Sequence, residues 1–487
     1  MALRQKTVAN IGWTAVSQAL SVGLTTVVLV ILASVLTPSD FGIYAACNIV
    51  VSLSIQFTTM GLDYAVINSK DKWSTVVSTG GFLRLGLSSL AFIVIILLAG
   101  PLSQFFNIEN LEVPIIAIST SLLILALAFV PQMDLTKNLR FKELSIAKVA
   151  SSITWSALSL TLAIFDFSYW SLIIAFVAAQ ASSVVVIYVY SRQRLRTRDF
   201  DGIARNRLLR FGGVTALGGL MASIQANADK FVVGSVRGSD SLGIYYAMYI
   251  YGISAPSILT TIINTVMFPT YSILTEKPLA FRKAYADSLR LVSEFAAPVS
   301  FGLAGASALF VTVLLGKNWM DGIMSLSFLA IAGFFIAMTS PAGNVFIALG
   351  RPQLLYQITL AFLVPEILVA ILAAQEFGMT GVAAVVMAFE GGKTVYVIHK
   401  AAQLTGMDLR ETASESVPFV VSGAAAGAFA LGISLLWDKS ILTLVFAVGV
   451  GIAIYLVLGS VLSKGKLRND VREVLALFRD RETTRLT

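Results

Sequence analysis

Three basic side chains lie inside long apolar stretches of this sequence: Arg84, Lys230 and Lys393. A charged group at the centre of a membrane-spanning helix costs about 2.5–3.5 kcal/mol, so such residues usually face a cavity or a partner. The guanidinium of Arg84 can bind a phosphate or pyrophosphate through two parallel hydrogen bonds, and a lysine can bind it as a point charge. These three residues are therefore the candidate binding residues for an anionic ligand.

Each of these bases also has a structural alternative. Arg84 could form an ion pair with a neighbouring helix or extend to the membrane surface. Lys393 follows Glu390 by three residues, a spacing that favours an ion pair on one helix face. Adjacent residues of a helix point about 100° apart, so Lys230 is not expected to pair with Asp229.

Polar and acidic residues in the same stretches are candidate coupling or cavity residues: Asn227, Asp229, Glu294, Glu366 and Glu390. Asn227 and Asp229 are the favoured polar pair of the interior, with a structural role as the alternative. Glu294 and Glu366 could bind a coupling cation or a proton, or could cap a kink or pair with another helix. The sequence leaves these alternatives open.

The overall composition indicates the class of protein in which these residues lie. The chain has 487 residues, of which 57% are hydrophobic and 13% charged, and its mean hydropathy is +0.83. A soluble domain carries about 25% charged residues, so a soluble enzyme is excluded. The single histidine, His399, and the single cysteine, Cys47, form no cluster that could hold a metal and favour no redox or histidine-based acid–base chemistry, although carboxylate chemistry without histidine stays open. No metal, cofactor or catalytic residue is assigned.

Fourteen apolar stretches are long enough to cross a bilayer, which requires about 20 residues per helix. They lie at 11–36, 41–63, 76–99, 113–131, 145–165, 169–191, 211–236, 242–268, 289–315, 323–348, 354–375, 380–399, 417–437 and 441–463. They show no alternating strand pattern, and open sheets cannot span lipid. The sequence therefore predicts an all-α integral membrane protein with about 14 transmembrane helices.

The positive charges are distributed unequally between the two sides of this map. On the side of the N-terminus lie 29 of the 35 lysines and arginines, and the longest loop on the opposite side has only twelve residues. Cytoplasmic loops carry an excess of Lys and Arg, so both termini are predicted to be cytoplasmic. The net charge of +8 is explained by this asymmetry and gives no argument for a nucleic-acid partner.

A short motif occurs twice, 201 residues apart, with six identities in fourteen aligned positions. The copies are Ser34-Val35 with Gly42-Ile43-Tyr44-Ala45-Ala46, and Ser235-Val236 with Gly243-Ile244-Tyr245-Tyr246-Ala247. Six spans separate them, so both copies run in the same direction, which is typical of two lobes related by an axis along the membrane normal. Chance recurrence of a glycine–aromatic turn is the alternative.

The expected domain organisation follows from this repeat. We expect two pseudo-symmetric six-helix lobes, 1–191 and 211–400, joined by a basic cytoplasmic linker at 192–210. Two extra helices follow over 417–463, where Gly423 and Gly427 have the spacing of a helix-packing pair. The basic tail at 464–487 is amphipathic, which suits a helix on the anionic inner membrane surface or a solvated helix.

Five segments carry a resemblance to a known family: TVANIGWTAVSQAL, ILASVLTPSDFGIYA and GLDYAVIN near the N-terminus, then LLRFGG and NADKFVVGSVRGSDSLGIYYAMY. The sequence resembles the polysaccharide transport branch of the MOP flippases, the Wzx-like exporters of lipid-linked oligosaccharides. Two departures stand out. Met60 occupies the position before a glycine where that branch has an acid, with Asp63 beyond it, and the first span lacks the embedded arginines of the related lipid II flippases.

The resemblance implies a transporter and not an enzyme. Its substrate would be an undecaprenyl-pyrophosphate-linked oligosaccharide, moved by alternating access from the cytoplasmic to the outer leaflet of a bacterial inner membrane, for exopolysaccharide, capsule or O-antigen synthesis. Membrane lipids and a polysaccharide polymerase or co-polymerase are the implied partners.

Two other functions remain as alternatives. A MATE-like multidrug or cation antiporter would share the two-lobe architecture, although three buried bases disfavour it. A membrane-embedded glycan polymerase or ligase would need a larger outer loop than twelve residues.

Overall fold

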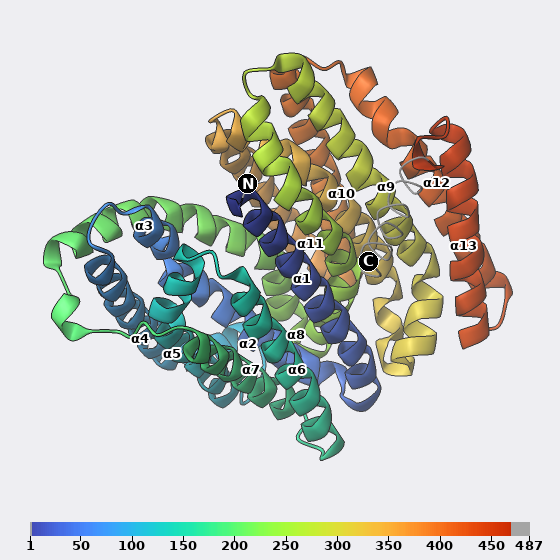
Figure 1. Cartoon of the computed structure of the whole chain (residues 1–487). Coiled ribbons are helices and arrows are strands. Elements are labelled where there is room, and N and C mark those ends of the chain that lie inside the picture. Colours follow the sequence, from blue (N-terminus) through green and yellow to red (C-terminus); the bar gives the residue numbers. More distant parts are fainter. Residues whose placement is uncertain (1, 469–487) are drawn as a thin grey trace, which may run out of the picture. The chain divides into compact units, whose positions relative to one another are not determined.

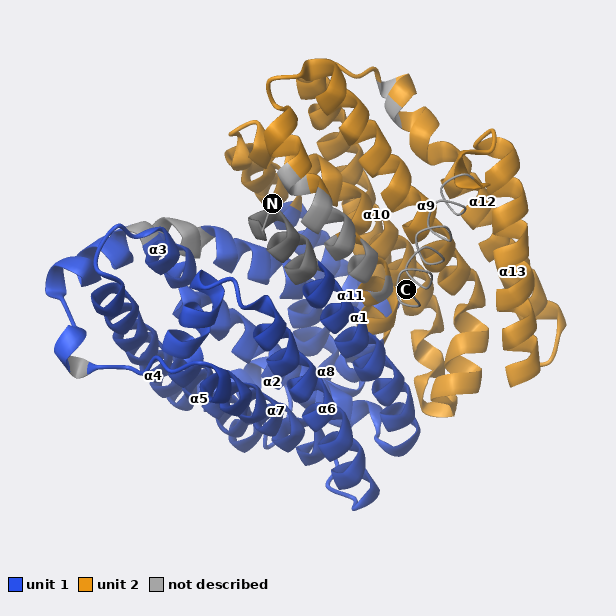
Figure 2. Ribbon diagram, in the orientation of Figure 1, with its two compact units in different colours: residues 1–247, 363–382 blue, residues 248–362, 383–487 orange. Residues whose placement is uncertain are grey.

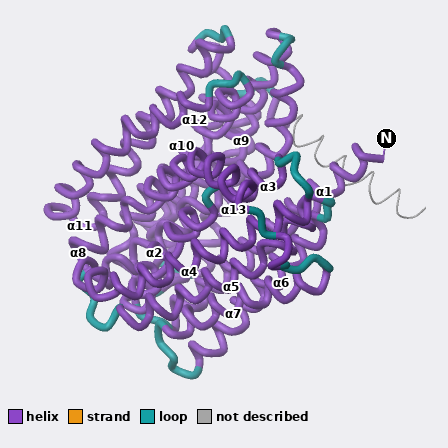
Figure 3. The backbone as a smooth tube through the Cα atoms, turned by 90° about the vertical axis from the view of Figure 1, so that its left-hand side faces the viewer, coloured by secondary structure: helices purple, strands orange, loops and turns teal. Residues whose placement is uncertain are grey.

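The computed structural model describes the backbone of residues 2–468 (Figure 1). Side chains are described over 12–468, except at positions 197, 211, 214–217, 255, 257–259, 261–266, 268, 269, 409 and 412. In this part of the chain the regular structure is helical throughout (Figure 3). Most of the predicted amphipathic tail, residues 469–487, lies outside the described residues.

The helices follow one another with short connections. Their bounds are α1 (Ala2–Val35), α2 (Pro38–Thr59), α3 (Leu62–Asn68), α4 (Trp73–Phe106), α5 (Glu112–Lys137), α6 (Phe141–Ile164), α7 (Trp170–Tyr190), α8 (Gly202–Leu274), α9 (Pro278–Phe310), α10 (Ile323–Ala348), α11 (Pro352–Thr405), α12 (Leu409–Leu436) and α13 (Ile441–Leu462). Short helical turns η1 (Thr197–Asp199), η2 (Val311–Leu315) and η3 (Lys317–Gly322) complete the order.

Eleven helical segments among the described residues are long and apolar enough to cross a membrane. The prediction of an all-helical, multi-pass membrane protein is thereby confirmed, whereas the number fourteen stays a prediction. The hydropathy pattern succeeds because a segment in lipid must satisfy its backbone hydrogen bonds internally, which an apolar helix does.

Two of the long helices, α8 and α11, contain a break at a single glycine. Gly238 has φ 75° and ψ −168°, and Gly378 has φ 62° and ψ −152°, conformations that are essentially restricted to glycine. A Cβ added to Gly378 would lie 2.9 Å from Nη2 of Arg237. The two breaks therefore lie next to each other, and each falls in the gap between two predicted spans.

Helix α2 has sharply defined ends. At its start, the Thr37 backbone N–H donates to the Asp40 carboxylate (2.8 Å) and the Asp40 N–H donates to the Thr37 hydroxyl (3.3 Å), which is a reciprocal cap. At its end, Thr59 is followed by Met60 and Gly61, both at positive φ (40° and 60°). The predicted span 41–63 is thus interrupted at Met60-Gly61, and α3 continues it in a new direction.

The chain divides into two compact units, which are described separately (Figure 2). Unit 1 comprises residues 1–247 and 363–382, and unit 2 comprises 248–362 and 383–487. In unit 1, α1 packs on α6, α6 on α7, and α4 on α5. In unit 2, α9 packs against α10 and α12, and α13 packs against α12.

The small-residue pair on α12 packs as its spacing predicts. A Cβ on Gly427 would overlap the carbonyl oxygen of Phe301, and one on Gly305 of α9 would overlap that of Gly427. Gly423 also approaches Ala297, with 3.0 Å between its added Cβ and the Ala297 carbonyl oxygen. Only glycine allows α9 and α12 to approach this closely, so these residues serve helix packing.

Within unit 1, the two copies of the repeated motif lie directly against each other. A Cβ on Gly42 would overlap the carbonyl oxygen of Ser239, and a Cβ on Gly243 would overlap the carbonyl oxygen of Pro38. A shift of 201 residues converts Gly42 into Gly243 and Pro38 into Ser239. The contact is therefore reciprocal, as expected for two copies related by a two-fold axis, and we call it the glycine contact.

Side chains reinforce the glycine contact. The hydroxyl of Ser39 donates to that of Ser239 (3.0 Å), and the rings of Tyr44 and Tyr246 meet edge to face with centroids 6.1 Å apart. The repeated motif is thus a packing element in which glycine permits close backbone approach and tyrosine fills the flanks.

Candidate anion-binding site

Arg84 lies at the break between α2 and α3. It belongs to α4, its residue surface is 7% exposed, and its Nη1 donates to the hydroxyl of Thr59 at 2.5 Å. The same hydroxyl donates to the carbonyl of Ile55 (2.6 Å), which fixes its orientation. Because the C-terminal end of a helix carries a partial negative charge, the last turn of α2 stabilises the guanidinium there.

Arg84 has no carboxylate within ion-pair distance among the described residues. Asp63, in the first turn of α3, is the acid that interacts with it electrostatically. An arginine has five N–H donors, and the described contacts of Arg84 use one of them. The guanidinium therefore keeps both its charge and enough donors to bind a phosphate bidentately.

The backbone at this break is also covered by α8. A Cβ on Gly212 would overlap the carbonyl oxygen of Met60, and one on Gly219 would lie 3.3 Å from Oε1 of Gln56. Helix α8 thus packs closely along the last turn of α2. Arg84 is itself buried in this conformation, so an anion could reach it only after a rearrangement of the surrounding helices.

Lys230 is paired in a buried polar cluster of unit 1. Its Nζ lies 3.3 Å from Oδ1 of Asp229 and donates to the carbonyl of Ala226 at 2.5 Å, while Tyr245 donates to the other oxygen of Asp229 at 2.8 Å. The expectation that adjacent residues do not pair is therefore wrong. The 100° rotation describes the direction of Cβ, whereas the flexible stem of a lysine brings Nζ back across the helix.

Asn227, the other member of the favoured polar pair, forms its hydrogen bonds with residues other than Asp229. Its amide donates to the carbonyl of Ser223 (2.8 Å) and to the hydroxyl of Ser52 on α2 (3.3 Å). Asn227 thus ties α8 to α2, and the partners described for Asp229 are Lys230 and Tyr245. Tyr245 was missed as a site residue, although the repeated motif contains it.

Lys393 and Glu390 form the buried ion pair that their spacing favours. Both residues belong to α11 and to unit 2, and their side chains are 8% and 7% exposed. The adjacent Thr394 donates to the carbonyl of Phe335 on α10 (2.8 Å). This pairing offsets the charge of Lys393, which leaves it poorly suited to bind a substrate anion in this conformation.

The remaining two candidate acids belong to α9 and α11. Glu294 of α9 is 2% exposed, and its backbone carbonyl accepts a hydrogen bond from the hydroxyl of Tyr455 on α13 (2.5 Å). Glu366 lies one residue after Pro365 in α11 and is half-buried. Over the described residues, no group of three or more His, Cys, Asp or Glu side chains could hold a metal ion.

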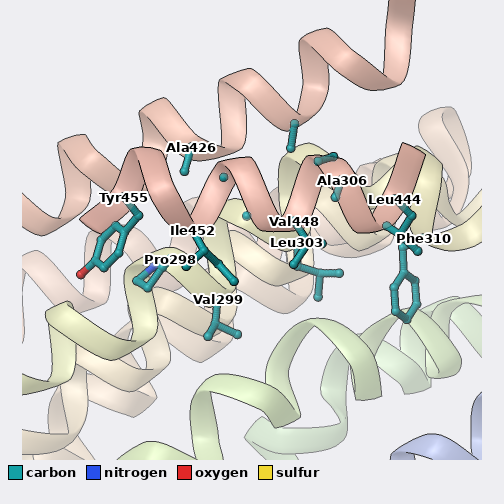
Figure 4. A pocket seen from close by; sticks show the side chains of 14 residues that line it. Pro298, Val299, Leu303, Ala306, Phe310, Ala426, Leu444, Val448, Ile452 and Tyr455 are labelled. Carbon is teal, nitrogen blue, oxygen red and sulfur yellow. The ribbon is translucent and has the colours of Figure 1, made fainter. Parts of the chain in front are cut away.

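An apolar pocket lies between α9, α12 and α13 of unit 2 (Figure 4). Its volume is about 400 Å³, and its lining includes Pro298 and Leu303 of α9, Ala426 of α12, and Val448 and Tyr455 of α13. Its surface is almost entirely apolar. This pocket can accept hydrocarbon but offers nothing to bind a pyrophosphate, so the candidate anion site remains the one at Arg84.

Residues 31–324 match the family described as "Polysaccharide biosynthesis protein", and this range is more than half of the chain. The chain belongs to this family. The resemblance to the polysaccharide transport branch of the MOP flippases is thus confirmed. Family membership agrees with the helical membrane fold described above.

Named relatives agree with this family. The chain is 23% identical to the lipopolysaccharide biosynthesis protein WzxC of Escherichia coli strain K12 over 391 residues, 78% of each chain. It is 24% identical to the teichuronic acid biosynthesis protein TuaB of Bacillus subtilis strain 168, over 61% of this chain and 62% of TuaB. It is also 22% identical to the succinoglycan biosynthesis transport protein ExoT of Rhizobium meliloti, over 66% and 65% of the two chains.

Solved structures share the fold. The lipid II flippase MurJ in an inward closed conformation superimposes with a TM-score of 0.73 at 13% identity, over 94% of this chain and 99% of MurJ. An inward-facing MATE transporter of the MOP superfamily gives a TM-score of 0.61 at 13% identity, over 80% and 94%. At such low identity these likenesses show the fold alone.

Proposed function

We propose that this protein is a flippase that moves an undecaprenyl-pyrophosphate-linked oligosaccharide from the cytoplasmic to the outer leaflet of the bacterial inner membrane. Membership of the polysaccharide biosynthesis family and the names of the relatives support the substrate class. The product would enter exopolysaccharide, capsule or O-antigen synthesis, beside a polysaccharide polymerase or co-polymerase. No bond of the substrate is broken, so the protein acts as a transporter.

At the level of single residues, the proposal rests on the contacts that Arg84 makes. Two of the three intramembrane bases, Lys230 and Lys393, are paired with carboxylates, whereas Arg84 lies on a helix end with donors to spare. Arg84 is therefore the pyrophosphate-binding residue of the proposal. Glu294 and Glu366 stay candidates for coupling to a cation or proton gradient, and Asp229 and Glu390 are each paired with a lysine.

The proposed transport cycle is alternating access between two six-helix lobes. Division of α8 at Gly238 and of α11 at Gly378 would give the fourteen transmembrane segments of the predicted map. The glycine contact brings together the predicted outer turns of the two lobes and would close that side. Both termini would then lie in the cytoplasm, as the distribution of positive charge predicts.

The test is transport by the purified full chain in proteoliposomes. A fluorescent undecaprenyl-pyrophosphate-linked oligosaccharide is placed in the inner leaflet, and its arrival in the outer leaflet is followed by quenching. We expect Arg84→Ala to abolish most of the activity and Arg84→Lys to restore part of it, since a point charge replaces a bidentate group only partly. Asn138→Ala, a substitution in the loop after α5, serves as the control.

Specific outcomes would overturn the proposal. Movement of the labelled lipid at the rate of empty vesicles would exclude a flippase, and proton-driven efflux of organic cations by the same vesicles would favour the antiporter. Incorporation of sugar into polymer by the protein alone would favour a polymerase. Full activity of Arg84→Ala would retain the flippase and reject the assigned residue.

A further inference from the structure

A second apolar pocket lies between α1 and α6 in unit 1. Its volume is about 320 Å³, and its surface is almost wholly apolar. Trp13, Val16 and Leu20 of α1 line one side, and residues of α6 such as Ile153 line the other. These four side chains are 44–57% exposed, so the pocket is open to the surroundings of the helices.

A lysine stands at one end of this pocket. Nζ of Lys142 lies 5.3 Å from the centre of the Trp13 ring. Lys142 precedes Ile146, Val149 and Ile153, which line the pocket, by four, seven and eleven residues, so all four share one face of α6. The pocket therefore has a cationic end and an apolar body.

The charge of Lys142 is not neutralised by the protein. Among the described residues no carboxylate lies within ion-pair distance of Lys142, whereas its neighbour Arg140 pairs with Glu143 at 3.0 Å. Lys148, further along α6, donates to the side chain of Gln18 and so connects α6 to α1. One lysine thus remains exposed beside a tryptophan, a combination that suits the interface between hydrocarbon and water.

We propose that this pocket binds an anionic glycerophospholipid, whose phosphodiester contacts Lys142 beside Trp13 and whose acyl chain lies between α1 and α6. The positive charge of Lys142 beside the Trp13 ring matches the single negative charge of a phosphodiester. The predicted topology places Lys142 at the cytoplasmic surface, where anionic lipids are enriched and attract basic residues. The bound lipid would fill the open space between α1 and α6 and hold these helices together.

The proposal is tested with the detergent-purified full chain by native mass spectrometry. The probes are palmitoyl-oleoyl phosphatidylglycerol and the matching phosphatidylcholine. We expect Lys142→Gln to weaken binding of phosphatidylglycerol about fivefold, because one basic residue near an anionic headgroup contributes about 1 kcal/mol. Binding of phosphatidylcholine should not change.

Lys137→Gln is the matched control. Lys137 also stands over a tryptophan, with its Nζ 3.7 Å from the centre of the Trp73 ring, but Trp73 does not line this pocket. Loss of this charge should leave the affinity for phosphatidylglycerol unchanged. A second variant, Val149→Phe, fills the pocket while retaining Lys142, and should also weaken binding of the lipid.

Three results would overturn the proposal. Equal binding of the two lipids by the unaltered protein would remove the role of charge. Equal losses in Lys142→Gln and Lys137→Gln would indicate general surface electrostatics. Binding of undecaprenyl pyrophosphate that depends on Lys142, without any such dependence for phosphatidylglycerol, would assign the pocket to the transported lipid instead.

Discussion

The glycine contact makes a quantitative prediction for Gly243→Ala. The added methyl group would overlap the carbonyl oxygen of Pro38 and would lie 2.7 Å from the backbone nitrogen of Gly42. Both neighbours are backbone atoms of α2, which cannot rotate away as a side chain can. Overpacking of this kind costs about 1–3 kcal/mol. The conformation with the contact closed should therefore become about 5- to 150-fold less populated relative to one in which it is open.

Disulfide cross-linking measures this population. Ser39 and Ser239 approach within 3.0 Å through their hydroxyl oxygens, so Ser39→Cys with Ser239→Cys, in a Cys47→Ala background, reports the closed contact. We expect rapid oxidation in this background and a much smaller cross-linked fraction once Gly243→Ala is added. The flipping rate should fall in parallel if the closed contact belongs to the transport cycle.

A matched control is Gly86→Ala in α4, where an added Cβ meets no described atom within 4 Å. Alanine is preferred to glycine in a helix by about 1 kcal/mol, so this variant should be neutral or slightly stabilising. Cross-linking and transport by Gly243→Ala at the rates of Gly86→Ala would refute the reasoning, since the close approach would then be absent from the working protein.

Three other substitutions test separate parts of the structure by unfolding in detergent. Lys393→Ala should destabilise the protein by about 3–5 kcal/mol because it leaves Glu390 buried without its ion-pair partner. The double variant Lys393→Met with Glu390→Leu should recover most of that loss. An equal loss of stability in the single and the double variant would contradict the pairing. Gly378→Ala should cost about 1–3 kcal/mol because its backbone conformation is open only to glycine, and an unchanged unfolding temperature would show that α11 runs straight. Tyr245→Phe should cost about 1–3 kcal/mol, as it removes the hydroxyl that donates to Asp229; a neutral result would mean that water replaces it.

The helical membrane fold could be predicted from the sequence because lipid imposes one simple requirement, a long apolar helix per crossing. Hydropathy could not predict how the helices are joined. Gly238 and Gly378 change the chain direction within a single residue, and Met60-Gly61 divides a span without any polar segment. In each case a positive φ makes the turn. The polar residues around Gly238 and Gly378 mark these two breaks in the sequence, but hydropathy does not show that a single residue makes each turn.

In the candidate site, too, contacts between residues close in the sequence could be predicted, whereas contacts between distant residues could not. The pair of Glu390 and Lys393 was predictable, because three residues on a helix fix the geometry of both partners. Arg84 and Thr59 are 25 residues apart and belong to different helices, so only the packing of α2 on α4 brings them together. The pairing of Lys230 with Asp229 was predicted wrongly because the end of a long side chain does not follow the direction of its Cβ.

The one-residue breaks at Gly238 and Gly378 also bear on how this membrane protein can be probed by accessibility experiments. A helix that reverses direction within a single residue leaves almost no loop that a protease, an antibody or a bacteriophage could bind. An epitope tag or reporter inserted at either glycine would also push Arg237 and Gly378 apart. Accessibility mapping of these two points should therefore use single-residue labels, because a longer insertion would itself change the structure that is being measured.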